Sequence, residues 1–210
     1  ILLTVGYRQE PIAVDDAELR EAIKARYPSC AGKWTLSVPF VERFFALAQG
    51  AKGKGRDAAG YVGLINSNNF TKREFGKKLI QDFLPSVDLS HVLDTSGCYI
   101  PGHGTPTVIL FGRNRSGDIE MPVRAALGIR GEPGRPQDAA KGLVWTALVE
   151  HVHQPGAETT WLSVADVDRG KFHQHPWSLK DGGADKVKDV VEESPRCVSN
   201  VANSLGFMAI

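Results

Sequence analysis

The chain has 210 residues, with 25 Lys and Arg against 24 Asp and Glu, so its formal net charge is only +1. Hydrophobic residues make up 42% and charged residues 23%, which is typical of a globular chain and excludes collagen-like, coiled-coil and wholly disordered proteins. No apolar run reaches the roughly 18 to 20 residues that cross a bilayer, so no membrane partner is expected. A net charge near zero provides no global basic field, so any nucleic-acid contact requires a local patch. Three scattered cysteines without a Cys-x-x-Cys pair favour a reduced, cytoplasmic protein.

The first hundred residues alternate between helical and strand-like patterns. Asp15, with Glu18 three residues on, predicts a capped helix to about Arg26. Apolar spacing predicts a second helix from about Val38 to Gln49, followed by a flexible basic loop and a buried strand. The loop covers 51–56 and the strand covers 60–65.

After this strand, the sequence pattern predicts a third helix and two further strands. Thr71 and Glu74 have the spacing of a capping box, and the apolar stripe behind them runs to Pro85. His91 to Leu93 and Thr105 to Phe111 are the strand candidates. A series of strands and helices of this kind predicts an α/β fold with a layered open sheet.

Beyond Gly112 the frequent glycines and prolines interrupt the pattern, and we place a domain boundary near 115–122. A strand is expected over 123–129. A helix is expected over 141–152, apolar around most of its circumference and therefore buried. Residues 155–185 are expected to be irregular, and an amphipathic piece follows at 185–193.

Two polar segments could carry chemistry. Asn66 to Asn69 directly follow a strand, where open α/β sheets place ligands, although Asn and Ser also make ordinary turns. Tyr99 to Thr107 form a loop rich in Gly and Pro, of the kind that lets a backbone approach a ligand closely. His103 within it could be a general base, a metal ligand, a phosphate contact or a plain loop residue. No Walker loop, His-Glu-x-x-His or Gly-x-Ser-x-Gly motif occurs.

The run YVGLINSNNFTKREFGKKLIQDFLPSVDLSHVLDTSGCYIPGHGTPTVILFGRNR (Tyr61 to Arg115) resembles the adenine-specific DNA methyltransferases of the BREX phage-exclusion systems, the PglX type. The resemblance continues upstream in KWTLSVPFVERFFALA and downstream in VRAALGIRGEP, GLVWTALVEHV and HPWSL. It implies part of a Rossmann-like methyltransferase sheet over 1–118. The start of an irregular α+β region leading into a DNA-recognition domain would follow over 119–210.

The resemblance also implies an enzyme that transfers a methyl group from S-adenosylmethionine to N6 of an adenine flipped out of double-stranded DNA, in phage defence. The resemblance also suggests other phage-exclusion proteins as possible binding partners. The family's Asn-Pro-Pro-Tyr/Phe motif is absent, because no Asn-Pro pair occurs and Arg8-Gln9-Glu10-Pro11 stand where it is expected. The cofactor motif is absent as well, so no catalytic, cofactor-binding or metal-binding residue is assigned.

The same resemblance suggests which residues contact DNA. Tyr99 is the candidate for a ring that packs against the flipped base, with Ile100 as the alternative if the register differs by one residue. The glycines and Thr105 would let the loop approach the DNA, and basic residues after the strand would contact phosphates. The full set of base-contacting or DNA-contacting candidates is Tyr99, Ile100, Pro101, Gly102, His103, Gly104, Thr105, Lys72 and Arg73. Lys77 and Lys78 share the basic face with the last two.

Three hypotheses follow. In the first, the chain is a partial methyltransferase, since it begins at Ile1 within an apolar run and stops at Ile210 without a turn. It would be inactive alone, because the Asn-Pro-Pro-Tyr/Phe and cofactor motifs are absent. In the second, it is a stand-alone, non-catalytic DNA-binding or interaction module that retains the Gly102-His103-Gly104 loop. The third, a metal-dependent nuclease that uses His103, Asp94 and Asp118, has little support because their spacing is not that of a ligand set.

Overall fold

A computed structural model describes residues 2–4, 17–51 and 58–179 of the chain. The expected N-cap Asp15, positions 52–56 of the basic loop and the amphipathic piece at 185–193 lie outside these ranges. Among the described helices, none combines the length and the apolar character needed to cross a lipid bilayer.

The centre of the fold is a six-stranded sheet with the order β1-β2-β4-β3-β5-β6. Strands β1, β2, β3 and β5 run in one direction, while β4 and β6 run antiparallel to their neighbours. The bounds are β1 Leu2–Thr4, β2 Tyr61–Ser67, β3 Asp88–Asp94, β4 Thr107–Arg113, β5 Val123–Gly128 and β6 Leu162–Val167. This mixed α/β structure confirms the expected fold class and is compatible with a Rossmann-like methyltransferase region.

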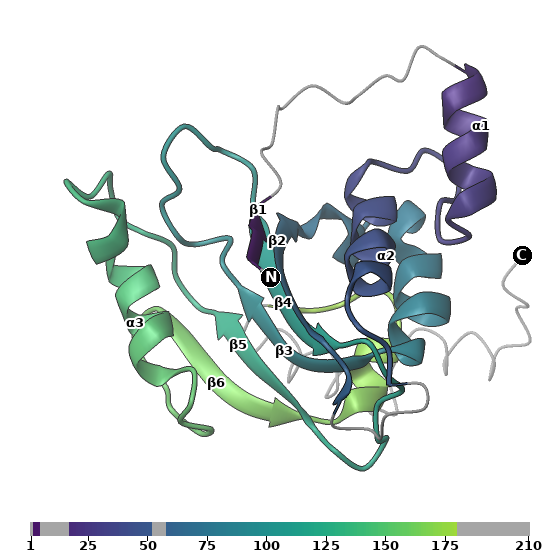
Figure 1. Ribbon diagram of the computed structural model, residues 1–210. Helices are drawn as coiled ribbons and strands as arrows, with labels where there is room; N and C mark the ends of the chain where they lie inside the picture. The colour runs from purple at the N-terminus through teal and green to yellow at the C-terminus, as the bar shows by residue number, and fades with distance from the viewer. Residues whose placement is uncertain (1, 5–16, 52–57, 180–210) are drawn as a thin grey trace, which may run out of the picture.

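The four strands that share a direction end at the same edge of the sheet, which we call the carboxyl edge. The ends of β2 and β3 lie level with each other, because Asn66 and Asp94 both pair with Val108 of the intervening β4. The loop from β3 to β4 and the connection from β5 to α3 both leave from this edge (Figure 1). In open α/β sheets, ligands bind outside the carboxyl ends of the strands.

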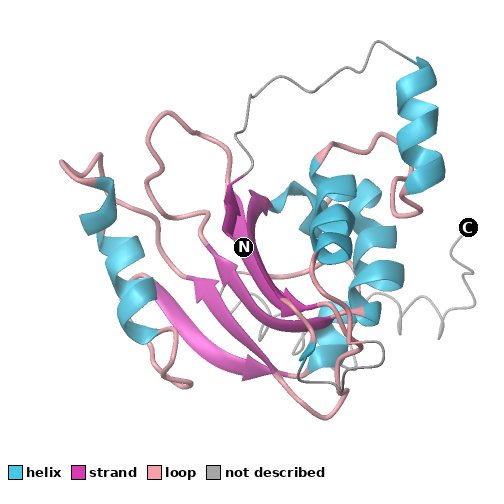
Figure 2. Ribbon diagram, in the orientation of Figure 1, coloured by secondary structure: helices cyan, strands magenta, loops and turns pink. Residues whose placement is uncertain are grey.

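Helical segments cover both faces of the sheet (Figure 2). Helix α2 (Ser37–Leu47) and the short helical turns between 68 and 86 pack on one face, and helix α3 (Leu143–His151) packs against β6 on the other. Helix α1 (Ala17–Arg26) has no buried residue. The strands alternate between the two faces, so Val92 contributes to the larger core and its neighbour Leu93 to the smaller one.

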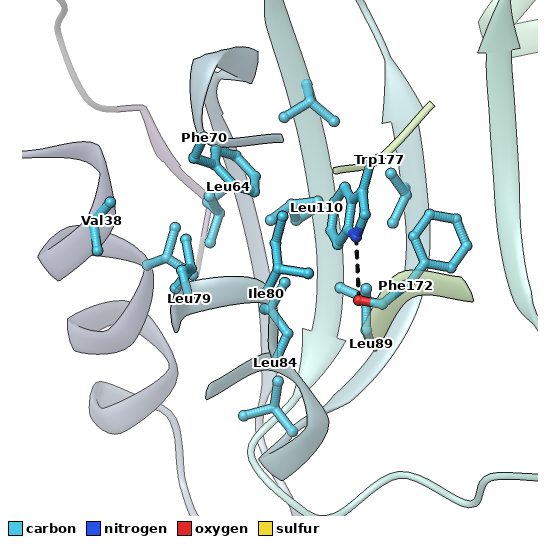
Figure 3. Packing of buried hydrophobic residues seen from close by; sticks show 14 of the residues in the cluster. Val38, Leu64, Phe70, Leu79, Ile80, Leu84, Leu89, Leu110, Phe172 and Trp177 are labelled. Atoms are coloured by element: carbon cyan, nitrogen blue, oxygen red, sulfur yellow. Dashed lines mark hydrogen bonds between the residues drawn. The ribbon is translucent and has the colours of Figure 1, made fainter. Parts of the chain in front are cut away.

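The larger core includes a segment far along the chain. Phe70, Leu79, Ile80 and Leu110 are at most 1% exposed, and Trp177 packs edge-on against Phe70 with ring centroids 5.7 Å apart (Figure 3). The Trp177 indole N–H donates to the Phe172 carbonyl at 3.2 Å, and its backbone N–H donates to the Thr71 carbonyl at 2.8 Å. The HPWSL segment therefore belongs to the same core as the sheet.

The expected capping box at Thr71 is wrong. The Thr71 hydroxyl donates to the Asn68 carbonyl at 2.7 Å, and the cap is Ser67, whose hydroxyl accepts from the Asn69 N–H at 3.3 Å. Residues 68–86 form short 3₁₀ and π segments instead of one regular helix. Of the expected apolar stripe, Leu79, Ile80 and Leu84 are nevertheless buried and Phe75 and Phe83 are partly buried. Tertiary packing therefore determines this segment more strongly than its local capping signal.

Three other expectations need correction. Strand β3 is longer than His91 to Leu93. Helix α3 is not buried all round, because Leu143 and Val149 are about half exposed, at 48% and 55%. The stretch expected to be irregular contains β6, which pairs with β5 along its whole length.

The sheet continues past the proposed boundary near 118. β5 pairs with β3, and β6 pairs with β5, so strands on both sides of that point share hydrogen bonds. Within the described ranges, the change in Gly and Pro content marks a connection between strands of one sheet. The division into 1–118 and 119–210 stays a prediction about the longer architecture.

Candidate functional site

The loop that connects β3 to β4 is closed at its base by two threonines. The Thr95 N–H donates to the Thr107 carbonyl at 3.1 Å, and their buried hydroxyls are hydrogen-bonded at 2.8 Å. The Cys98 N–H donates to the Thr95 carbonyl at 3.0 Å, so a tight turn follows the strand immediately. These bonds fix both ends of the loop at the carboxyl edge, and its tip extends beyond the sheet.

The tip of this loop is a turn formed by Ile100, Pro101, Gly102 and His103. The His103 N–H donates to the Ile100 carbonyl at 3.1 Å, and Gly102 has φ +69°. Proline at the second position and a positive-φ glycine at the third are the residues that a type II turn requires. Pro101, Gly102 and Gly104 are exposed, whereas Tyr99, Ile100, His103 and Thr105 are partly buried. The sequence-predicted loop residues therefore lie together in one protruding turn.

The polar run after β2 has a structural role. Asn66 is buried, and its side-chain amide donates to the Ser37 carbonyl at the start of α2, at 3.2 Å. Ser67 caps the following turn, and the Asn68 N–H donates to the Pro106 carbonyl at 3.0 Å. Of the two interpretations of this run, the ordinary turn is the one that these contacts support.

Lys72 and Arg73 are exposed and follow the same turn, next to the carboxyl end of β2. The Arg73 carbonyl accepts a hydrogen bond from Nε2 of His175 at 3.1 Å, which fixes the backbone here without occupying the guanidinium. Lys77, farther along, lies 3.8 Å from a Glu74 carboxylate oxygen. The segment thus presents positive charge to one side of the β3–β4 loop.

A second loop, formed by residues 129–142 between β5 and α3, lies on the other side. The Glu132 N–H donates to the Gly97 carbonyl at 2.9 Å. A Cβ atom added to Gly97 would lie 3.1 Å from the Cα of Gly131 and 3.2 Å from the Arg130 carbonyl oxygen. The two loops are therefore packed backbone to backbone, and glycine at position 97 permits that approach.

Sequence reasoning missed two residues of this second loop. Arg130 and Arg135 are exposed, and the Arg135 guanidinium lies over the Tyr99 ring, 5.9 Å from its centroid. Their position in the sequence could have indicated them, because both belong to an Arg-Gly-Glu-Pro-Gly-Arg run directly after β5. This strand runs in the same direction as β2 and β3, so the run lies at the carboxyl edge. That direction was not predictable, because the sequence alone did not reveal how β5 pairs.

A pocket of about 130 Å³ lies at the junction of the two loops. Its polar end is the buried Asp94, whose carboxylate accepts from the Ser96 N–H at 2.9 Å. A Cβ on Gly128 would lie 2.6 Å from the other Asp94 carboxylate oxygen, so this glycine allows the close approach. The complete lining is Asp94, Ser96, Gly97, Gly128, Ile129, Arg130, Gly131 and Val144.

Cys98 is not suited to act as a nucleophile at this edge. Burial, together with the nearby Asp94 and Glu132 carboxylates, raises the pKa of its thiol to about 12. The thiol stays protonated at neutral pH, and the thiolate is the reactive form.

The nuclease hypothesis finds no support in the geometry. Within 17–51 and 58–179, no three His, Cys, Asp or Glu side chains gather in a way that could hold a metal ion. His103, Asp94 and Asp118 therefore do not form a ligand set in the structure.

His91 provides a pH-sensitive feature on the α3 side of the sheet. Its ring packs edge-on against Phe111, with centroids 5.9 Å apart, and its Nδ1 lies 3.0 Å from the Ser90 hydroxyl. Burial lowers its pKa below the ordinary value, Arg124 and His153 lower it further, and Asp166 opposes them. The ring is therefore neutral in the folded chain at pH 7.

We expect the free energy of unfolding to fall as the pH drops below about 6.5, because the unfolded chain then binds a proton that the folded chain resists. The His91→Gln variant should show a shallower decline between pH 7 and pH 5 in urea titrations. Some decline should persist, because burial also lowers the pKa of His173. An equally steep decline in the variant would show that His91 titrates normally in the folded state.

A search against protein-family models finds no match. A search of curated proteins finds a relative in Streptomyces coelicolor, the adenine-specific methyltransferase PglX, 46% identical over 202 residues. Over this stretch the chain is therefore similar to PglX. The match covers 95% of the chain but only 17% of the PglX sequence. It confirms the resemblance found in Tyr61 to Arg115 and in the segments before and after that run.

Proposed function

We propose that this chain is part of an adenine-specific DNA methyltransferase of the PglX type, and that its carboxyl edge faces double-stranded DNA. The observation that carries the proposal is the 46% identity to PglX over 95% of the chain. The fold supports it, because the loop suggested as the DNA contact leaves from the edge where such sheets bind ligands. The whole enzyme would transfer a methyl group from S-adenosylmethionine to adenine N6, in the cytoplasm, as part of phage exclusion together with other proteins of that system.

In this proposal the β3–β4 loop supports the flipped adenine. Tyr99 supplies a ring for stacking, with Ile100 as the alternative, since both side chains are partly buried beside the turn. Pro101 and Gly102 fix the turn, and the small residues around His103 let the backbone approach the DNA. Lys72 and Arg73 neutralise phosphates on one side of the loop.

No cofactor-binding residue is assigned in this chain, because the family's cofactor motif does not occur in its sequence. No step of methyl transfer is therefore assigned to a residue of this chain. We expect no methyl transfer to duplex DNA by the 210 residues alone, in an assay with radiolabelled cofactor, and measurable transfer would contradict this assignment.

The test of the proposal uses the 210-residue chain and a duplex that contains a single bulged 2-aminopurine, whose fluorescence falls when it stacks. Binding should quench the probe. The Tyr99→Ala variant should bind about 5- to 150-fold more weakly and quench less, because stacking of a base on an aromatic ring is worth roughly 1 to 3 kcal/mol. The Ile100→Ala variant reports on the alternative register.

The matched control is Tyr61→Ala. Tyr61 is 71% exposed and also has an arginine over its ring, Arg113 at 4.4 Å, but it begins β2 and so lies at the opposite edge of the sheet. This control should bind and quench like the unmodified chain. The absence of DNA binding, or equal losses in the Tyr61 and Tyr99 variants, would contradict a DNA-facing carboxyl edge.

A further inference from the structure

From the contacts of the second loop we infer that Arg130 and Arg135 contact the DNA backbone. We also infer that Arg135 covers the Tyr99 ring in the free protein and moves from it to a phosphate when a base takes its place. This inference rests on the proposed function, since it concerns the same carboxyl edge. It adds a second contact segment and a positioning residue, neither of which the sequence resemblance supplied.

The second loop is held firmly against the first. Besides its bond to Gly97, Glu132 accepts hydrogen bonds from the backbone N–H groups of Leu143 and Val144, both at 3.0 Å. One residue thus ties the second loop both to the β3–β4 loop and to the start of α3. DNA lying against Tyr99 would therefore also lie close to residues 130–135.

The outward charge of the second loop is positive, although its composition is mixed. The Glu132 carboxylate is directed to the start of α3, and the Asp138 carboxylate accepts from the Ala140 N–H at 3.0 Å, with Lys141 4.0 Å away. Arg130 and Arg135, by contrast, are exposed. Together with Lys72 and Arg73, which follow β2, they place positive charge on both sides of the β3–β4 loop, an arrangement suited to a phosphate backbone.

Arg135 and a flipped base compete for the Tyr99 ring. The guanidinium lies 5.9 Å from the ring centroid, near the outer limit of about 6 Å for a cation–π contact, so the interaction is weak and exposed. A phosphate oxygen offers the same guanidinium shorter, charge-assisted hydrogen bonds. DNA therefore provides both the base that replaces Arg135 on the Tyr99 ring and the phosphate that binds the displaced Arg135 guanidinium.

The test measures how the affinity of the 210-residue chain for the bulged duplex depends on salt. Each lost phosphate contact should reduce the slope of log K against log salt by about 0.9. Arg135→Ala and Arg130→Ala should each show this reduction, whereas Arg135→Lys should retain the slope because it retains the charge. The control Lys171→Ala removes an exposed cation that follows β6 at the opposite edge, and its slope should not change.

Competition for the ring is tested by a double-mutant cycle. In the unmodified chain, Arg135→Ala removes a phosphate contact and also a competitor of the base, so the two effects partly cancel. In the Tyr99→Ala background only the phosphate contact is lost, so Arg135→Ala should weaken binding by a larger factor there.

Unchanged salt slopes for both arginine variants would overturn the backbone contact, and equal losses in the two backgrounds would overturn the covering of Tyr99. Either result leaves the proposed function intact if Tyr99→Ala still reduces quenching. A chain that shows no DNA binding would overturn both.

Discussion

Replacing Gly76 with alanine is expected to lower the free energy of unfolding by about 3 kcal/mol or more. A Cβ atom at this position would lie 1.8 Å from the Phe70 carbonyl oxygen and 2.6 Å from its carbon. Both atoms belong to the backbone, so no side-chain rotation can relieve the overlap. Phe70 is completely buried and packs against Trp177, so a backbone shift there would disturb the larger core.

Urea titration followed by tryptophan fluorescence measures this loss, with the slope m checked for constancy. Gly134→Ala is the matched control. An added Cβ at Gly134 meets nothing within 4 Å, and its φ is outside the left-handed region, so its effect should stay within about 0.5 kcal/mol. A loss below 1 kcal/mol for Gly76→Ala would show that the turn between Phe70 and Gly76 adapts in solution.

Much of the layered fold was predictable, because the spacing of apolar residues along the chain indicates which side chains are buried. The expected strand at 60–65 and the strand beyond Pro106 are both present. Leu79, Ile80 and Leu84 of the expected stripe are buried, and its two phenylalanines are partly buried. The capping box failed because its four-residue signal is worth little beside the tertiary contacts of Phe70 and Thr71. Local signals predicted which residues are inside, but not the exact form of the backbone.

The site was only half predictable for a related reason. The β3–β4 loop could be found from its own glycines and prolines, which fit the turn at Ile100 to His103. Arg135 contacts Tyr99 only because β5 pairs in parallel with β3, and this pairing joins positions far apart in the sequence. No local pattern contains that information, so a contact between two loops becomes visible only in three dimensions.

The partly buried ion cluster around Asp88 leads to the second large prediction: Asp88→Asn should lower the free energy of unfolding by about 3 kcal/mol. The Asp88 carboxylate lies between two guanidinium groups, with one oxygen 2.8 Å from Nη2 of Arg115 and the other 3.1 Å from Nη2 of Arg169. The Arg169 side chain is only 4% exposed. The asparagine keeps the shape of the side chain but leaves a buried positive charge without its counter-ion.

The control is Asp166→Asn, which breaks the ion pair with Arg124 on the sheet surface. The Asp166 side chain is 37% exposed, so this loss should be at most about 1 kcal/mol. The double variant Asp88→Asn with Arg169→Met should recover part of the loss, because an apolar side chain needs no counter-ion. Equal losses in the two single variants would show that water reaches Arg169 in solution.

The position of this cluster makes the same experiment informative about domain structure. Asp88 begins β3, Arg115 follows β4, and Arg169 follows β6 and also donates from Nε to the Met121 carbonyl at 3.0 Å. The cluster therefore connects segments on both sides of position 118, at the edge opposite the proposed DNA contact. Because the sheet is also continuous there, the chain should unfold in one cooperative transition, which Asp88→Asn shifts to lower urea without splitting. Two separate transitions would instead indicate that the segments before and after 118 are independent units.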